Sequence, residues 1–169
     1  FDEPMTRIYN ILEAKLWDEE VRGFVGHDVY YLSGYEKAFK LHGDGEPQLL
    51  FYEADKLKAI YVYMKRKTTI AGYFDSVTPY GYGGILLEGN TSEENLKAFW
   101  NAYVEKMKEI GIVDNFVRYH PVLRNAIPMK SVSTVIDLGK TIAIDLSSPD
   151  VIWENIISKN RNMIRKALK

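Results

Sequence analysis

Apolar residues recur along this chain with two spacings, and each spacing predicts a type of element. Segments 48–53 and 58–66 are rich in aromatic and β-branched residues and are separated by a short polar stretch, which predicts an antiparallel hairpin. The first segment is apolar on both faces, so we expect it to be a central strand. Further strands are expected at 8–12, 113–120, 132–138 and 141–146, the last two joined by a tight turn at Gly139 and Lys140.

Helical spacing marks the remaining apolar positions. Helices are expected over 15–24, from Ser33, and from Ser148 with Pro149 at its first position, the last with a break near 158–160. The clearest helix follows Thr91 and Glu94, whose spacing predicts a capping box, and Gly111 ends it. Its apolar stripe consists of Leu96, Phe99, Trp100, Tyr103, Met107 and Ile110.

The order of these elements predicts the fold class. Strands alternate with helices, but several neighbouring strands are joined by short turns, which indicates an α+β fold: a mixed, mostly antiparallel sheet flanked by helices. No internal repeat or low-complexity linker interrupts the 169 residues. We therefore expect residues 1–169 to form a single domain.

Composition excludes several classes of protein. An apolar content of 46% and an aromatic content of 13% indicate a compact fold, and the net charge of −1 gives no general attraction to DNA or membranes. The absence of cysteine excludes a disulfide framework, a thiolate metal site and a cysteine nucleophile. No apolar run approaches the roughly 20 residues of a membrane span. A soluble, cytoplasmic protein is the expectation.

Residues 74–84, with the sequence FDSVTPYGYGG, form the most specialised segment of the chain. Glycine lets the backbone approach a ligand closely or take positive φ, and tyrosine supplies a flat apolar surface with a polar tip. We expect a rigid contact surface of the size of a sugar or peptide. Its contact residues would be Tyr80 and Tyr82, its close-approach backbone Gly81, Gly83 and Gly84, and its neighbouring polar group Asp75. The alternatives are a connecting loop that packs its own tyrosines and a carboxylate that braces it.

Other chemistry is sparse. None of the three histidines has a second ligand at metal spacing, and the serine elbow, Walker loop and dinucleotide fingerprint are missing, so we expect no metal and no nucleophilic triad. His120 and Arg118 lie at the end of a predicted strand, where ligands often bind, although a structural hydrogen bond would explain His120 equally well. Arg161, Arg165 and Lys169 share one face of the last helix and could bind the phosphates of a nucleotide sugar or a tRNA, or simply be a solvated flank.

Five motifs, taken in order, resemble the FemAB-like acyltransferases, the Fem-type non-ribosomal peptidyl transferases associated with methicillin resistance. The motifs are Asp28-Val29-Tyr30-Tyr31-Leu32, Thr78-Pro79-Tyr80-Gly81-Tyr82-Gly83-Gly84, Arg118-Tyr119-His120-Pro121, Thr141-Ile142-Ala143-Ile144-Asp145-Leu146 and residues 161–169, RNMIRKALK. Each motif alone is weak, but their order and spacing hold from about residue 28 to the end of the chain.

This resemblance implies a function that composition could not show. Family members carry two tandem domains of the Gcn5-related N-acetyltransferase fold, and the best-known ones transfer an amino acid from aminoacyl-tRNA to the peptide stem of a UDP-linked or lipid-linked peptidoglycan precursor. The match covers the first domain. It implies that this chain is the acceptor-binding fragment of a cell-wall enzyme, inactive alone, with the catalytic lysine and much of the donor site in a second domain.

The chain also departs from the family. The best-known members carry a Pro-Arg-Gly-Pro-type loop where this chain has Tyr80 to Gly84, and the acyl-CoA-binding pattern of true N-acetyltransferases is absent, so we expect no acetyl-CoA and no other cofactor. Two alternatives stay open: a free-standing acetyl-CoA-dependent N-acetyltransferase and a non-catalytic ligand-binding or assembly module. A fragment that exposes the surface for a second domain would also be prone to dimerise through it.

Overall fold

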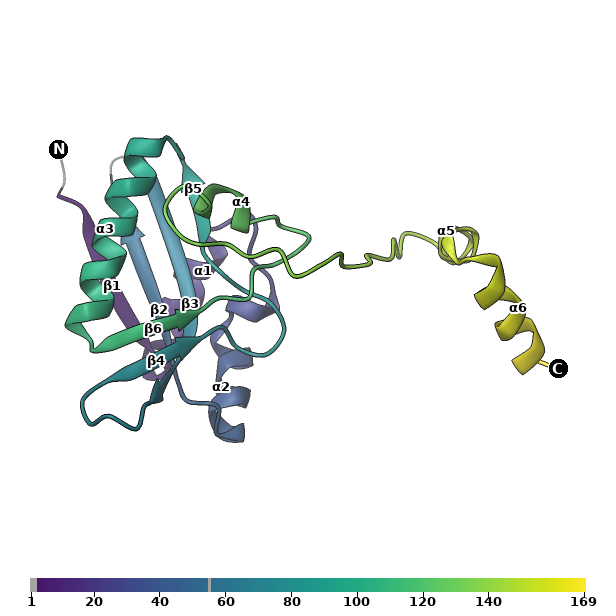
Figure 1. The fold of residues 1–169 in the computed structure, drawn as a ribbon, viewed down its shortest axis with the longest axis horizontal. Helices are drawn as coiled ribbons and strands as arrows, with labels where there is room; N and C mark the ends of the chain where they lie inside the picture. The colour runs from purple at the N-terminus through teal and green to yellow at the C-terminus, as the bar shows by residue number, and fades with distance from the viewer. Residues whose placement is uncertain (1–2, 55) are drawn as a thin grey trace. The chain divides into compact units, whose positions relative to one another are not determined.

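The chain divides into two compact units. The computed structural model describes residues 3–54 and 56–169, and the division falls between Ile136 and Asp137. Residues up to Ile136 are called unit 1 and the remainder unit 2, and each is described by itself (Figure 1).

A six-stranded mixed sheet forms the centre of unit 1. The strands follow the order β1-β2-β3-β4-β6, and β5 also pairs with β3. Every pairing is antiparallel except the parallel pairing of β4 with β6. The strands are β1 (Met5–Asn10), β2 (Glu46–Glu53), β3 (Leu57–Lys67), β4 (Phe74–Val77), β5 (Leu86–Gly89) and β6 (Ile112–Phe116). The predicted hairpin is confirmed as β2 and β3, and β2 lies inside the sheet as expected.

Helices cover both faces of this sheet, because the residues of the inner strands alternate between two apolar cores. One core joins Leu49 and Phe51 to α1 (Ala14–Arg22), and α2 (Ser33–His42) packs on α1. The other core joins Leu50 and Tyr52 to α3 (Glu93–Glu109), which Figure 1 shows along the opposite face. Shorter helices are η1 (Ile11–Glu13), η2 (Val29–Tyr31) and α4 (Ala126–Met129). The predicted α+β class is thereby confirmed.

The start of α3 differs from the prediction by one residue. Ser92, not Thr91, is the N-cap, and its hydroxyl accepts a hydrogen bond from the amide of Asn95. The side chain of Asn90 accepts from the Ser92 amide, which holds Thr91 in the turn before the helix. The end of the helix is as predicted, since Gly111 follows it with φ +78°.

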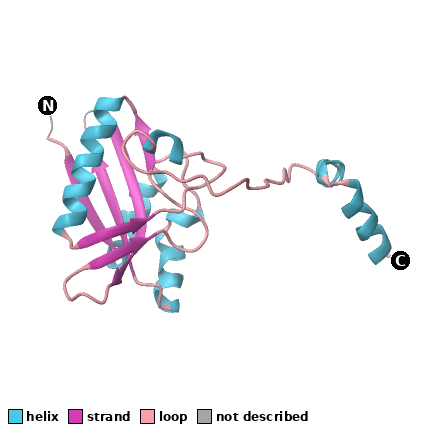
Figure 2. Ribbon diagram, viewed as in Figure 1, coloured by secondary structure: helices cyan, strands magenta, loops and turns pink. Residues whose placement is uncertain are grey.

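Several predicted strands are shorter or absent. The first strand ends at Asn10, because Asn10 and Glu13 form a capping box that starts η1. The strand predicted at 113–120 is ordered as β6 only to Phe116. The predicted strands 132–138 and 141–146 are wrong, and Figure 2 draws that stretch as loop. Val132 and Val135 pack against the core of unit 1, but the apolar residues from Ile136 on, such as Leu138 and Ile142, are exposed. Alternating apolar residues make a strand only where another strand satisfies the backbone, and within the described chain none pairs with this stretch.

Unit 2 contains two helices, α5 (Pro149–Asn155) and α6 (Ser158–Ala167). The hydroxyl of Ser148 accepts from the Val151 amide, which confirms the predicted start. The expected break is present but lies earlier than predicted, at Ile156 and Ile157, and residues 158–160 begin α6. None of the helices that the structure describes is both long and apolar enough to cross a bilayer.

Candidate functional site

The tyrosine- and glycine-rich segment interrupts a strand of the sheet. Strand β3 pairs with β4 up to Met64 opposite Val77, and with β5 from Ile60 opposite Leu86. Three residues of β3 (61–63) thus lie opposite eight residues of chain (78–85), so five residues are extruded from the ladder. Residues 78–85 are called the Tyr-Gly loop. A bulge of this size re-aims side chains away from the sheet, as smaller bulges do near active sites.

Backbone hydrogen bonds tie the Tyr-Gly loop to the segment that follows β6. The amide of Thr78 donates to the Phe116 carbonyl over 3.1 Å, and the amide of Gly83 donates to the Arg118 carbonyl over 2.9 Å. The carbonyl of Gly83 in turn accepts from the His120 amide over 3.1 Å. Because both ends of the loop are bonded to a neighbouring segment, the loop is an ordered part of the sheet edge.

The loop glycines are required by the protein's own tyrosines. Gly81 has φ +99°, and a Cβ at this position would overlap the ring of Tyr30. Gly84 has φ +94°, and its Cβ would lie 2.6 Å from Cδ1 of Tyr119. Any other residue would therefore meet both backbone strain and a ring. Close approach of backbone to a ligand was predicted here; the structure shows instead a close approach to the protein's own aromatic side chains.

Asn125 joins the loop to the chain after β6, and sequence reasoning missed it. Its side chain is buried, donates to the Gly83 carbonyl over 2.8 Å and accepts from the His120 amide over 2.9 Å. Weaker bonds at 3.3 Å reach the Ile85 carbonyl and the Tyr31 hydroxyl. No local pattern marks a single asparagine 40 residues from the loop it holds, so sequence alone offered no signal.

Asp28 and His120 form the charged centre of the site. His120 Nε2 lies 2.8 Å from Asp28 Oδ2, with 12% of the His120 side chain and 33% of the Asp28 side chain exposed. Asp28 is the N-cap of η2, and its Oδ1 accepts from the Tyr30 amide over 2.9 Å. The structure thus gives His120 a specific carboxylate partner. Asp28 belongs to the first motif, but the spacing of residues in the sequence could not predict that it pairs with a residue 92 positions away.

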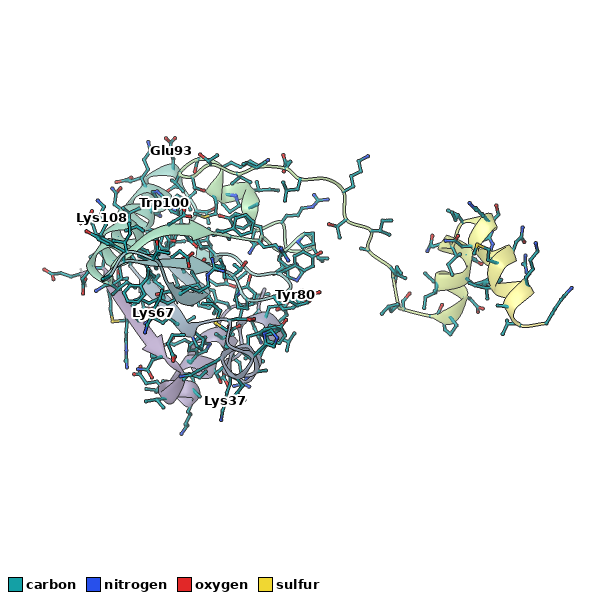
Figure 3. All side chains as sticks on the ribbon, turned by 60° about the horizontal axis from the view of Figure 1, so that its bottom comes forward. Lys37, Lys67, Tyr80, Glu93, Trp100 and Lys108 are labelled. Carbon is teal, nitrogen blue, oxygen red and sulfur yellow. The ribbon has the colours of Figure 1, made fainter. Side chains whose placement is uncertain are left out.

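Aromatic side chains continue from this pair to the surface. Tyr30 contacts Tyr82 and Tyr35 edge to face, with ring centroids 6.2 and 5.3 Å apart, and Tyr82 also packs on His120. The Tyr35 hydroxyl donates to the Tyr80 carbonyl over 2.6 Å, and burial raises the pKa of that hydroxyl. Tyr80 is 72% exposed at the surface of unit 1 (Figure 3). Phe39 contacts Tyr35 and stacks on Tyr80, with ring centroids 4.9 and 6.1 Å apart.

A cavity of about 710 Å³ lies near the loop. It is bounded by β5, the first turn of α3 and α4, and its lining is mostly apolar, including Leu86, Leu96 and Leu123. Asn125 also lines it, so one buried side chain contacts both the cavity and the Tyr-Gly loop. Arg124 at its edge has φ 53°, a conformation that non-glycine residues rarely adopt.

The remaining predicted residues lie elsewhere or have other partners. Asp75 lies on β4 and forms a bidentate ion pair with Arg66 at 2.7 and 2.9 Å, so the structure shows no hydrogen bond from it to the loop. The side chain of Arg118 is exposed, while its backbone anchors the loop. Among the described residues, no group of three or more histidines and carboxylates could hold a metal ion.

The basic row of unit 2 is partly occupied by internal contacts. Arg161 donates to the carbonyls of Trp153 and Glu154, at 3.1 and 3.0 Å, and so caps the end of α5. Arg165 lies 5.3 Å from the ring centre of Trp153 and donates to Asn162. Lys169 is exposed at the end of the chain. Arg161 and Arg165 are therefore less available than Lys169 to bind an external phosphate.

One carboxyl group outside the site is fully buried. Glu36 on α2 has no exposed surface, and neither of its side-chain oxygens has a hydrogen-bond partner among the described residues. Burial raises the pKa of this carboxyl to about 9. It is therefore protonated at neutral pH, because an ionised carboxylate without a partner is costly to bury.

Comparisons with known proteins add little to this geometry. No family model matches the chain, and a search of curated proteins finds no significant match. Among solved structures, the ribosomal-protein-alanine N-acetyltransferase from Brucella melitensis biovar Abortus 2308 aligns with a TM-score of 0.44 at 9% identity. The alignment covers 83% of this chain and 98% of that one. A TM-score this low carries no argument about fold family or activity.

Proposed function

We propose that this chain is the acceptor-binding part of an amide-forming acyltransferase of the FemAB-like type. One observation carries the proposal: three of the five motifs that resemble this family meet at one site in unit 1. Asp28 of the first motif pairs with His120 of the third, and Tyr30 packs on Tyr82 of the second. These contacts join residues 92 and 52 positions apart in sequence, as expected if the motifs serve one function.

The proposed reaction forms one bond and breaks another. The acceptor amine, once deprotonated, attacks the carbonyl carbon of an activated acyl ester, and a C–N bond forms. The bond from carbonyl carbon to ester oxygen then breaks, the amine nitrogen loses a second proton, and the leaving alcohol gains one. Such chemistry relies on positioning the amine and stabilising the oxyanion, and needs no covalent nucleophile.

The site residues divide between binding and support in this proposal. Tyr80 and Tyr82 contact the acceptor, because one is exposed and the other is half-buried beside the Asp28–His120 pair. Gly81 and Gly84 let the loop pack against the rings of Tyr30 and Tyr119, and Gly83 lets it pack against Thr78, which fixes the contact surface. The exposed side chain of Arg118 is a polar contact in unit 1. In unit 2, Lys169 with Arg165 would contact phosphates, such as those of an aminoacyl-tRNA.

The test is an acyl-transfer assay with the full-length protein. A UDP-linked muramyl-pentapeptide serves as the acceptor, aminoacyl-tRNA as the donor, and mass spectrometry detects the amide product. Tyr82→Ala should raise the KM for the acceptor at least several-fold, since aromatic contacts of this kind contribute about 1 kcal/mol each. Tyr73→Ala, at a half-exposed tyrosine outside the loop, is the matched control. An equal KM for the acceptor in both variants would show that the Tyr-Gly loop does not bind the acceptor.

The cavity near the loop favours a second candidate, an N-acetyltransferase that uses acetyl-CoA without a partner domain. Its volume of about 710 Å³ and apolar lining fit the size range of a cofactor site. Saturable binding of acetyl-CoA by this chain, with acetylation of an amine, would establish this candidate in place of the first. Tight binding of a ligand with no turnover in the full-length protein would instead indicate a non-catalytic module.

A further inference from the structure

The carboxylate of Asp28 accepts hydrogen bonds from two N–H groups. The Tyr30 amide donates to its Oδ1, and His120 Nε2 donates to its Oδ2. The protonation of His120 follows from its other nitrogen, which accepts from the amides of Val122 and Leu123 at 3.2 and 3.4 Å. A nitrogen that accepts from two amides carries no proton, so the single ring proton resides on Nε2. The hydrogen bonds therefore place an imidazole N–H beside the carboxylate.

The negative charge of Asp28 has no cation to balance it. Within the described part of the chain, no lysine or arginine forms an ion pair with this carboxylate. One third of the Asp28 side chain is exposed, against 12% of the His120 side chain, so Asp28 is the more accessible member of the pair. By contrast, Asp75 has a similar exposure of 30% but a bidentate arginine partner. Asp28 is thus an accessible anion with unused acceptor capacity.

Aromatic rings pack on the histidine partner of this anion. Tyr30 and Tyr82 both pack on the His120 ring, with centroid distances of 6.0 and 5.7 Å, and contact each other edge to face. Aromatic faces attract cations, and they favour organic ammonium groups whose methylene stems pack on the rings. A single carboxylate offers too few oxygens for Ca²⁺, which takes six to eight ligands, and no cluster of metal-ligating side chains is found among the described residues. The surroundings therefore select an amine over a metal ion.

We propose that Asp28, with the rings of Tyr30 and Tyr82, binds a primary ammonium group. This inference rests on the proposed function and makes the bound group the amine of the acceptor. The carboxylate holds the charged amine beside the loop, and the hydrogen bond from His120 orients that carboxylate. Asp28 would then be a substrate-binding residue, and His120 a positioning residue.

The experiment is an NMR titration of the isotopically labelled chain with n-butylammonium chloride at pH 7 and low salt. Low salt matters because exposed charges are screened at higher ionic strength. Resonances of His120, Tyr30 and Tyr82 should shift and saturate in the millimolar range, whereas n-butanol should give no saturable shift. The affinity should fall at least tenfold in Asp28→Asn and remain unchanged in Asp75→Asn. Equal shifts with butanol, or an unchanged affinity in Asp28→Asn, would overturn the inference.

A second variant guards against a folding defect in Asp28→Asn. Tyr82→Leu keeps apolar volume but removes the ring, and should weaken butylammonium binding several-fold without loss of the folded amide spectrum. An unchanged affinity in this variant would also overturn the inference. Failure of the proposed function looks different: butylammonium binding with no acyl transfer by the full-length protein would refute the transferase and leave the ammonium site in place. If Asp28→Asn transfers the acyl group as fast as the unchanged protein, the ammonium site is refuted and the proposed function stands.

Discussion

Substitution of Gly81 by alanine tests whether the Tyr-Gly loop is held in place by its own aromatic packing. The matched control is Gly43→Ala, because the two glycines have nearly the same φ, +99° and +100°. An added Cβ meets nothing within 4 Å at Gly43, whereas at Gly81 it overlaps the ring of Tyr30. The pair of variants therefore separates backbone strain, which both share, from collision with the ring.

The expected magnitudes follow from these two contributions. Positive φ costs an alanine about 1–2 kcal/mol, so Gly43→Ala should lower the free energy of unfolding by about that amount. Gly81→Ala should lose a further 1–3 kcal/mol, roughly the cost of overpacking, because Tyr30 is wedged between Tyr35 and Tyr82. Urea unfolding measures both values, and the ring signals of Tyr82 should shift only in Gly81→Ala. Equal destabilisation of the two variants, with Tyr82 undisturbed, would refute the packing argument.

Three further predictions concern buried or capping groups. The pKa of Glu36 is raised from about 4.5 to about 9, so the stability contributed by its protonated form is complete below pH 4.5 and is lost toward pH 9, at up to about 1.4 kcal/mol per pH unit. Glu36→Gln should flatten this slope in urea unfolding between pH 5 and 9, and parallel curves would contradict the assignment. Asn125→Asp keeps the acceptor for the His120 amide but cannot donate to the Gly83 carbonyl, so unfolding free energy should fall by about 2–4 kcal/mol, and a loss below about 0.5 kcal/mol would contradict this. Arg161→Ala removes two hydrogen bonds to the last carbonyls of α5 and should speed amide hydrogen exchange in unit 2 about fivefold. The control Lys166→Ala should leave the exchange rates unchanged. Equal exchange rates in the two variants would show that the cap is unimportant.

The fold was largely predictable where the apolar pattern of a segment matches the core or strand that it packs against. The stripe of α3 and the hairpin of β2 and β3 are confirmed, because their apolar residues face cores that exist on both sides of the sheet. The strands expected at 132–138 and 141–146 are wrong for the opposite reason. Their alternation is genuine, but a strand also needs a neighbour, and sequence alone does not say whether one is present.

The site was only partly predictable. The Tyr-Gly loop and His120 were found because unusual residues are concentrated there. Their supports, Asn125 and the pairing of Asp28 with His120, depend on contacts between residues 40 to 94 positions apart, which leave no local signature. Sequence also could not show that Asp75 pairs with Arg66, since that depends on the register of β3 with β4.

The most direct test of the account is a calorimetric titration of the chain with a UDP-linked muramyl-pentapeptide, at low and at moderate salt. The account predicts saturable binding that weakens with salt, since phosphate and ammonium contacts are both electrostatic. Acetylation of the free amine of the peptide should weaken binding further, and Asp28→Asn should abolish that difference. A folded protein that binds neither form of the pentapeptide would contradict the claim that this chain receives a peptidoglycan acceptor.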